Sequence, residues 1–258
     1  MSVIDKFYIK GKTAVVTGGS VGLGAQSAEA LAEVGANVVI AARKVERCID
    51  MCKRLEKLGV KALPVACDVS KAEDCQNLVD ETVREFKTLD ILVNNAGISW
   101  IQDSMEMPID KWEKVIKLNL TGAFQLSVMS GRVMRDQGGG KIINMASIGG
   151  FGGDIPENVD SVAYTSSKGG MLTLTRDLAV KWAPYGILVN AICPGWFPTS
   201  LNRELLENMK EKLIPRIPLA RYGNDEDLKG LVVFLASSAS DYITGQFFVI
   251  DGGQTARV

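Results

Sequence analysis

The stretch Thr13-Ala14-Val15-Val16-Thr17-Gly18-Gly19-Ser20-Val21-Gly22-Leu23-Gly24 joins a short apolar run to a glycine-rich turn. Residues 25–34, which follow, have helical periodicity. Glycines in such a turn let the backbone approach a pyrophosphate and leave that anion at a helix N-terminus, where free N–H groups point outward. Strand-to-helix turns also use glycine for steric reasons alone. We interpret the turn as a dinucleotide site that comprises Gly18, Ser20, Val21, Gly22, Leu23 and Gly24.

The same alternation of apolar run and helical stretch continues along the chain. Runs rich in Val, Ile and Ala recur at residues 13–17, 37–42, 62–67, 91–94, 141–145, 188–192 and 247–250. Helical periodicity lies between them at residues 25–34, 45–58, 72–86, 112–134, 171–183 and 225–236. Apolar strands that alternate with helices predict a parallel sheet covered on both faces. We expect residues 1–258 to form a single α/β domain, a doubly wound parallel sheet of the Rossmann type.

Composition narrows the classes of partner. The 258 residues are 47% hydrophobic and 23% charged, as expected for one large globular domain. The formal net charge of -1 provides no field that would attract nucleic acid or an anionic membrane. Residues 1–12 contain no continuous apolar segment, so we expect no signal peptide, no membrane span and a cytoplasmic protein.

The sequence contains no histidine and five cysteines, with no CxxC motif. The lack of histidine excludes Ser-His-Asp and Cys-His triads and every metal site with a histidine ligand. The odd number of cysteines and their spacing favour free thiols, and we expect no metal. Acid–base chemistry must therefore use tyrosine, lysine or carboxylates.

The segment Tyr164-Thr165-Ser166-Ser167-Lys168 places a phenol and an ammonium four residues apart, on one face of a helix that begins near Tyr164. A nearby ammonium favours the phenolate. At about 4 Å and an effective dielectric of about 20, the attraction is on the order of 4 kcal/mol before desolvation, enough to lower the phenol pKa by up to about three units. Taken alone, the pair is also an ordinary surface pair of an amphipathic helix.

Two strand ends point to the adenosine half of a dinucleotide. The second strand ends in Ala42-Arg43, without the acidic residue that binds a ribose 2′-hydroxyl, and an arginine there can accept a 2′-phosphate. We therefore expect a preference for NADP(H), with NAD(H) possible and a solvated helix-start residue as the alternative for Arg43. Asp68, after the third strand, is placed to bind the adenine edge. Its alternative role is a cap on the next helix, for which Ser70 competes.

The motifs occur in the order seen in short-chain dehydrogenases/reductases, and the chain resembles that family over essentially its whole length. The resemblance rests on the glycine turn, Asp68-Val69, Asn94-Asn95-Ala96-Gly97, Asn119, Ser147, Tyr164-x-x-x-Lys168 and Pro194-Gly195. It implies an oxidoreductase that transfers a hydride between nicotinamide and a carbonyl or secondary alcohol. It also implies further cofactor contacts at Val69, Asn95, Ala96, Gly97, Tyr164, Lys168, Pro194, Gly195 and Thr199.

The resemblance also implies roles. Tyr164 would be the general acid in reduction and the general base in oxidation, and Lys168 would lower its pKa and bind the nicotinamide ribose. Ser147 would polarise the substrate carbonyl, Asn119 would hold a water that links Lys168 to solvent, and Thr199 would contact the nicotinamide carboxamide. The alternatives are a strand-end cap for Ser147, a helix kink for Asn119 and a helix N-cap for Thr199.

One departure from the family pattern affects the pocket rim. Sixteen residues separate Ser147 from Tyr164, more than is usual, and include a loop from Gly152 to Asp160. Such a loop can bulge outward without displacing the strand end or the helix start. Ser161, near the helix start, is an alternative to Ser147 as the hydroxyl that acts on substrate.

The substrate is less clearly indicated. We expect residues 196–218 to cover the substrate, and aromatic and apolar side chains to line the pocket: Trp100, Ile148, Phe151, Trp196 and Phe197. The C-terminal part resembles both 3-oxoacyl-[acyl-carrier-protein] reductases and gluconate 5-dehydrogenase-like members. We favour a 3-oxoacyl-thioester reductase, with a sugar-acid oxidoreductase or a non-catalytic dinucleotide-binding sensor as alternatives.

Charges and assembly give further expectations. A reductase that acts on an acidic carrier protein should have basic residues near the pocket mouth, and the candidates are Arg132, Arg135 and Lys181. The long loop instead adds acidic residues beside the site: Asp154, Glu157 and Asp160. The family commonly forms tetramers through its two long helices and last strand. Residues 246–250 are apolar for a sheet edge, which is consistent with pairing across subunits in a homotetramer.

Overall fold

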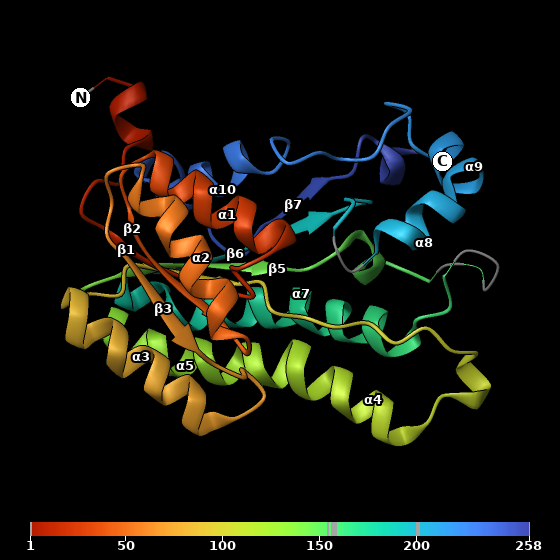
Figure 1. Ribbon diagram of the computed structural model, residues 1–258, viewed down its shortest axis with the longest axis horizontal. Helices are drawn as coiled ribbons and strands as arrows, with labels where there is room; N and C mark the ends of the chain where they lie inside the picture. Colours follow the sequence, from red (N-terminus) through yellow and green to blue (C-terminus); the bar gives the residue numbers. More distant parts are fainter. Residues whose placement is uncertain (1, 154, 156–158, 200–201, 258) are drawn as a thin grey trace.

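The computed structural model describes residues 2–153, 155, 159–199 and 202–257. Within them, seven strands form one parallel sheet in the order β3-β2-β1-β4-β5-β6-β7 (Figure 1). The strands are β1 (Thr13–Thr17), β2 (Asn37–Ala42), β3 (Ala62–Ala66), β4 (Ile91–Asn94), β5 (Gly140–Met145), β6 (Ile187–Pro194) and β7 (Phe247–Ile250). The fold is therefore the doubly wound α/β domain that the alternating pattern predicts.

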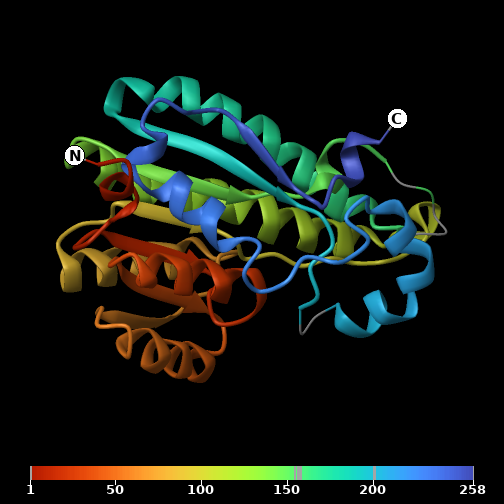
Figure 2. The same cartoon turned by 90° about the horizontal axis from the view of Figure 1, so that it is seen from above.

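Helices cover both faces of the sheet. They are α1 (Gly22–Glu33), α2 (Val45–Glu56), α3 (Ala72–Phe86), α4 (Ile109–Ile116), α5 (Gly122–Asp136), α7 (Val162–Trp182), α8 (Arg203–Asn208), α9 (Lys210–Leu213) and α10 (Lys229–Ala236). Short 3₁₀ turns lie at Ile4–Phe7, Ser104–Glu106, Ile148–Gly150, Ala183–Tyr185, Ile214–Arg216, Ser238–Ser240 and Gln254–Ala256. Figure 1 shows α1, α2 and α10 on one side of the sheet and α3, α5 and α7 on the other. Figure 2 shows α10 beside α1.

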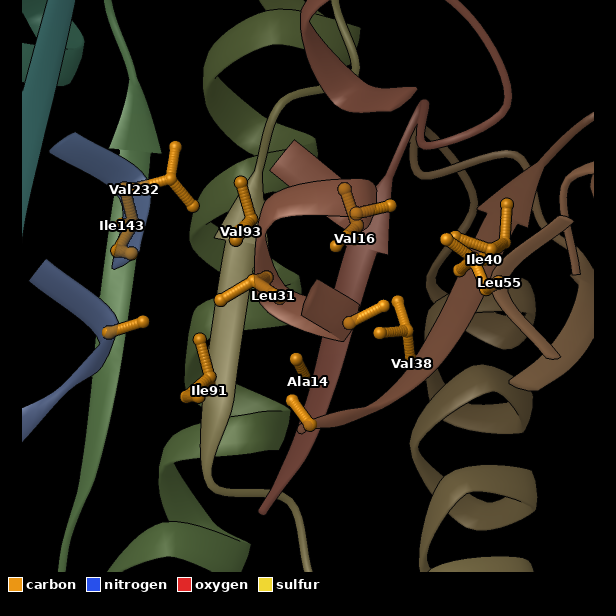
Figure 3. Close-up of a cluster of buried hydrophobic side chains, with 14 of the residues drawn as sticks. Ala14, Val16, Leu31, Val38, Ile40, Leu55, Ile91, Val93, Ile143 and Val232 are labelled. Atoms are coloured by element: carbon orange, nitrogen blue, oxygen red, sulfur yellow. The ribbon is translucent and has the colours of Figure 1, made fainter. Parts of the chain in front are cut away.

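The core has two parts because successive strand residues point to opposite faces. In β1, Ala14 and Val16 pack toward Leu31 of α1, whereas Val15 packs with Leu126 of α5 in the cluster on the other face. Figure 3 shows the first cluster, in which side chains of β1, β2, β4 and β5 meet those of the covering helices. All five residues of β1 are therefore buried, as the continuous apolar run predicts.

The largest differences between the observed boundaries and the sequence pattern are in three helical regions. The helix expected at residues 112–134 comprises α4, a π-helical turn at Lys117–Thr121, and α5. The helix with Tyr164 and Lys168 begins at Val162. The helix expected at residues 225–236 begins at Lys229, because the Asp227 carboxylate accepts bonds from Arg221 and the Asn224 N–H and fixes a turn there.

The strand order reverses beside β1, which lies between β2 and β4. In sheets of this kind, ligands bind outside the carboxyl ends of the strands at that reversal. The glycine turn follows β1, Asn95 follows β4 and Ser147 follows β5, so the predicted site residues gather at this edge. Among the described residues, no helix is long and apolar enough to cross a membrane.

Candidate active site

The glycine turn is fixed by the loop after β4. Asn95 donates from its side chain to the Thr17 carbonyl (2.9 Å), and the Thr17 hydroxyl accepts the backbone N–H groups of Asn95 and Ala96 (3.0 Å each). A Cβ on Gly24 would lie 2.3 Å from the Gly18 carbonyl oxygen. The turn therefore closes this tightly only with glycine at position 24.

The N-terminus of α1 has the donors that a pyrophosphate requires. Gly22 begins the helix with a φ of +56°, and the residue before it, Val21, supplies no side-chain cap. The first N–H groups of a helix have no intrahelical partner, and the helix dipole favours an anion there. The residues present thus fit the diphosphate of a dinucleotide.

Arg43 and Asp68 follow β2 and β3 at the carboxyl edge of the sheet, where the sequence predicts the adenosine half of the dinucleotide. Burial opposes ionisation of the Asp68 carboxyl, but hydrogen bonds from the side chain and backbone of Ser70 and the charge of Arg43 outweigh it, so the pKa of Asp68 is lowered. Lys71 occupies the N-cap position of α3, so neither Asp68 nor Ser70 is the helix cap considered from the sequence. Arg43 itself is exposed.

Gln125 is a residue of this region that the sequence did not indicate. Its side-chain amide donates to the Val69 carbonyl and contacts the Cys75 sulfur. Gly122 on the same helix packs against Val69, since a Cβ there would lie 2.6 Å from that carbonyl oxygen. A glutamine inside a long amphipathic helix carries no sequence signal for this contact.

Asn119 lies in the π-helical turn and is fully buried. Its side chain accepts the Ile98 N–H (2.9 Å) and donates to the Ile98 carbonyl (2.9 Å) and the Ser167 hydroxyl (3.0 Å). Asn119 thus lies in an irregular turn between α4 and α5. The same geometry joins the loop after β4 to the helix with Lys168.

The Ser147 hydroxyl is near enough to the Tyr164 phenol for hydrogen bonding that lowers the phenol pKa. Ser147 lies two residues beyond the end of β5 and accepts the Gly149 N–H at its hydroxyl (3.1 Å), so it also caps the short turn that follows. Ser161, the alternative hydroxyl, precedes α7 and makes no side-chain cap. The structure therefore brings Ser147 to the phenol.

Burial raises the pKa of Tyr164, and the hydrogen bond with Ser147 opposes the rise only in part. This direction is opposite to the one expected from the sequence. The Lys168 ammonium lies 5.5 Å from the centre of the Tyr164 ring, but it donates to the Met145 carbonyl (2.6 Å). Burial of the phenol therefore sets the direction of the shift, and Tyr164 holds its proton at neutral pH.

Lys168 is only 4% exposed. Burial lowers its pKa from 10.5 to about 8, because an ammonium loses solvation there. Gly97 lies close by, since a Cβ on it would be 3.8 Å from the Lys168 Nζ and 3.4 Å from the Asn119 Oδ1. Lys168, Asn119 and Gly97 thus share one buried volume beside Tyr164.

Cys193 borders the same volume and was not indicated by the sequence. It is fully buried in β6, hydrogen-bonds with the Ser147 backbone and interacts with the Lys168 charge. Burial raises the pKa of its thiol to about 12, so Cys193 is neutral beside the lysine at physiological pH.

The segment after β6 returns to the glycine turn. Gly195 donates to the Ile250 carbonyl (2.9 Å), directly after Pro194 at the end of the strand. Thr199 contacts Gly22, because a Cβ on that glycine would lie 3.1 Å from the Thr199 methyl group. Asn202 is the N-cap of α8, so Thr199 is not the helix cap considered from the sequence.

The expected rim residues divide into two groups. Trp100 and Phe151 are partly exposed, and Ile148 and Trp196 are half-buried. Phe197 is instead buried in the core, where its ring packs against Gly223, so it does not lie on the rim.

The long loop after Ser147 is joined to the loop after β4. Asp160 accepts the Gln102 N–H at its carbonyl (3.0 Å) and the Ser104 N–H at its carboxylate (3.1 Å). Asp154 and Glu157 lie outside the described residues. Asp160 therefore links the residues just before α7 to the loop after β4.

The basic residues suggested for a carrier protein lie elsewhere. Arg132 and Arg135 are near the end of α5, just before β5 begins, and Lys181 is near the end of α7, just before β6 begins. These positions are at the amino edge of the parallel sheet, opposite the edge with Ser147. The expectation that they flank the pocket mouth is wrong, because helix direction places them at the other end of the domain.

Comparison with known proteins identifies the class. The family model described as Enoyl-(Acyl carrier protein) reductase matches residues 18–255. The chain is 39% identical over 258 residues to 2-dehydro-3-deoxy-D-gluconate 5-dehydrogenase of Escherichia coli (strain K12), covering 99% of this chain and 100% of that protein. It is 37% identical over 246 residues to 3-oxoacyl-[acyl-carrier-protein] reductase FabG of Aquifex aeolicus (strain VF5), covering 95% and 98%.

A solved structure has the same fold as this chain. The gluconate 5-dehydrogenase of Burkholderia cenocepacia J2315, in complex with NADP and tartrate, superposes with a TM-score of 0.94 at 34% identity, covering 100% of both chains. These matches and the fold define a nicotinamide-dependent oxidoreductase that acts on CH–OH and C=O groups. The chain belongs to the short-chain dehydrogenase/reductase family. The alternative of a non-catalytic sensor is therefore set aside.

Proposed function

We propose that this protein is an NADP(H)-dependent reductase of 3-oxoacyl thioesters. The observation that supports this substrate class is the apolar border of the site. Trp100, Ile101 and Met105, in the loop after β4, and Phe151, after Ser147, all expose apolar surface, Met105 to 95%. These segments follow β4 and β5 at the carboxyl edge of the sheet, and exposed apolar groups there favour a ligand with an apolar chain.

Four side chains would carry the reaction. When bound, the nicotinamide supplies the hydride. Ser147 and Tyr164 donate hydrogen bonds to the carbonyl oxygen as negative charge develops on it, and Tyr164 gives up its proton. The protonated state that burial favours in Tyr164 suits this direction, because reduction consumes a proton at that oxygen. Lys168 would return a proton to the phenolate, and a water held by Asn119 would link Lys168 to solvent.

The cofactor would lie along the carboxyl edge of the sheet. The glycine turn (Gly18, Ser20, Val21, Gly22, Leu23, Gly24) would bind the pyrophosphate, and Arg43 would bind the 2′-phosphate. Asp68 and Val69 would contact the adenine. The remaining contacts are proposed for Asn95, Ala96, Gly97, Tyr164, Lys168, Pro194, Gly195 and Thr199. We further propose that residues 196–218 cover the bound substrate within one dinucleotide-binding and catalytic domain.

A second candidate function has one specific observation in its favour. The 39% identity to a 2-dehydro-3-deoxy-D-gluconate 5-dehydrogenase extends over the whole of both chains. A sugar-acid substrate would use the same chemistry at Tyr164. The two candidates differ only in what the border of the site must bind.

A panel of carbonyl substrates tests the proposal. We expect the purified enzyme to oxidise NADPH rapidly with an acetoacetyl thioester and slowly with 5-ketogluconate, as measured by the loss of NADPH absorbance. A bulky aromatic ketone and a steroid ketone serve as further probes of the apolar border. Faster turnover of the ketogluconate would favour the sugar-acid function and overturn the thioester proposal.

The choice between NADP(H) and NAD(H) rests on Arg43. Replacing it with aspartate (R43D) should weaken NADPH binding by about 100-fold, because a charge-assisted contact to phosphate is lost and a like charge is added. NADH binding should change far less, and titration of cofactor fluorescence measures both. Lys57→Asp, at the other end of α2, makes the same charge change as a control. Equal losses for both cofactors in R43D would contradict the 2′-phosphate role.

We also propose a homotetramer. The strand β7 is at the edge of the sheet with Val249 exposed, and α5 and α7 expose Phe124 and Val180. Unpaired apolar edges of this kind favour pairing with a second copy. A mass in solution equal to one chain would contradict this assembly.

A further inference from the structure

Residues 202–216, here called the covering segment, contain α8 and α9 and lie beyond the carboxyl end of β6 (Figure 1). At the N-terminal end of the segment, the Asn202 side chain accepts hydrogen bonds from the Thr199 N–H (2.6 Å) and the Thr199 hydroxyl (2.9 Å). The same side chain donates to the Phe197 carbonyl (3.0 Å). Beyond the other end, Ile217 is buried and Leu219 donates to the Gly252 carbonyl (3.1 Å). Both ends of the segment are therefore attached to the sheet edge.

The middle of the covering segment has a separate attachment. The Tyr222 hydroxyl donates to the Leu206 carbonyl of α8 at 2.9 Å. This carbonyl is in the last turn of the helix, where carbonyls lack intrahelical partners and accept from outside groups. The buried side chains of Leu206 and Leu213 add apolar contact, which has no preferred direction. The Tyr222 hydroxyl thus gives α8 a directional contact with residues outside the segment.

The backbone that carries Tyr222 is held on both sides. The Arg221 guanidinium makes two hydrogen bonds to the Asp227 carboxylate (2.6 and 2.9 Å), and the Gly223 N–H donates to the Trp196 carbonyl (2.9 Å). Gly223 also packs so closely on Phe197 that a Cβ would lie 2.4 Å from its ring. Tyr222 therefore extends from a fixed base, and its hydroxyl determines where α8 lies.

We propose that Tyr222 is a positioning residue for the reductase reaction, which holds α8 in place so that the covering segment closes correctly over the site. Thr199, just before the segment, lies against Gly22 of the glycine turn, so the position of α8 also affects the border of the cofactor site. The expected effect of Tyr222 on the reductase reaction rests on the proposed function. Its expected effect on the position of α8 does not depend on that function.

The test is Tyr222→Phe, which removes only the hydroxyl. Arg203, Lys210 and Lys212 are exposed trypsin sites within the covering segment. Because one hydrogen bond no longer opposes opening, we expect cleavage at these sites to be about three- to tenfold faster, as followed by mass spectrometry. The KM for the best substrate should rise by a similar factor, with kcat within about twofold and an unchanged melting temperature. Tyr242→Phe is the matched control, since Tyr242 is fully exposed.

Cleavage of Tyr222→Phe at the wild-type rate would overturn the proposal. Equal acceleration at sites throughout the chain, with a lower melting temperature, would also overturn it, because Tyr222 would then stabilise the whole fold. Proteolysis requires no substrate, so faster local cleavage supports the conformational role of Tyr222 even if the thioester panel fails. An active panel with unchanged cleavage contradicts that role alone.

Discussion

Replacing Tyr164 with phenylalanine should lower the rate of NADPH oxidation by about a thousandfold, because the general acid and one of the two donors to the carbonyl oxygen are lost together. The hydroxyl accounts for the loss, since the ring remains in the same buried space. Cofactor affinity should change by less than about tenfold, because Tyr164 is only one of the many cofactor contacts proposed here and the pyrophosphate contacts do not involve it. Stopped-flow turnover and cofactor titration measure the two effects separately.

Tyr185→Phe is the matched control for this experiment. Tyr185 follows the same helix, at its far end, and is 47% exposed. Its variant should behave like wild type. If Tyr164→Phe retained wild-type turnover with every active substrate, the acid assigned to this site would be wrong, and Lys168 and Cys193 would be the titratable side chains left beside it.

The fold could be predicted because its signals are local. Each apolar run became a strand, and the glycine turn, Asn95 and Ser147 follow β1, β4 and β5, so parallel topology alone brings them to one edge. Some helix boundaries were predicted wrongly. The start of α10, for example, depends on a side-chain contact that no local sequence pattern encodes. The bond between Arg221 and Asp227 fixes the turn before that helix.

The site was predicted less completely because its electrostatics depend on burial. From spacing alone, Lys168 should lower the pKa of Tyr164, but the folded chain aims the ammonium at the Met145 carbonyl and buries the phenol. Gln125 and Cys193 enter the site through packing across elements, which the sequence does not show. Arg132, Arg135 and Lys181 were misplaced because a basic residue on a helix gives no sign of which end of the domain it occupies.

Lys168 should reduce the stability of the fold at neutral pH, as expected for a functional group buried with its charge. A pKa lowered from 10.5 to about 8 means that the ammonium costs the folded state about 3 kcal/mol. Lys168→Met removes that cost but leaves the Met145 carbonyl without this partner, a loss of roughly 1–2 kcal/mol. We therefore expect the free energy of unfolding of Lys168→Met to be about 1–2 kcal/mol higher than that of wild type. Its turnover should be lowered by about a hundredfold.

The pH dependence of that stability difference tests its origin. As pH rises from about 8 to 10.5, folded wild type releases the Lys168 proton while the unfolded chain still holds it, so wild-type stability increases relative to the variant. The advantage of Lys168→Met in urea unfolding should therefore be largest near pH 7 and should shrink through this window. Lys181→Met, an exposed lysine on the same helix, should show almost no difference at either pH. An advantage for Lys168→Met that stayed constant from pH 7 to pH 10 would mean that side-chain packing, and not the buried charge, sets the stability of this position.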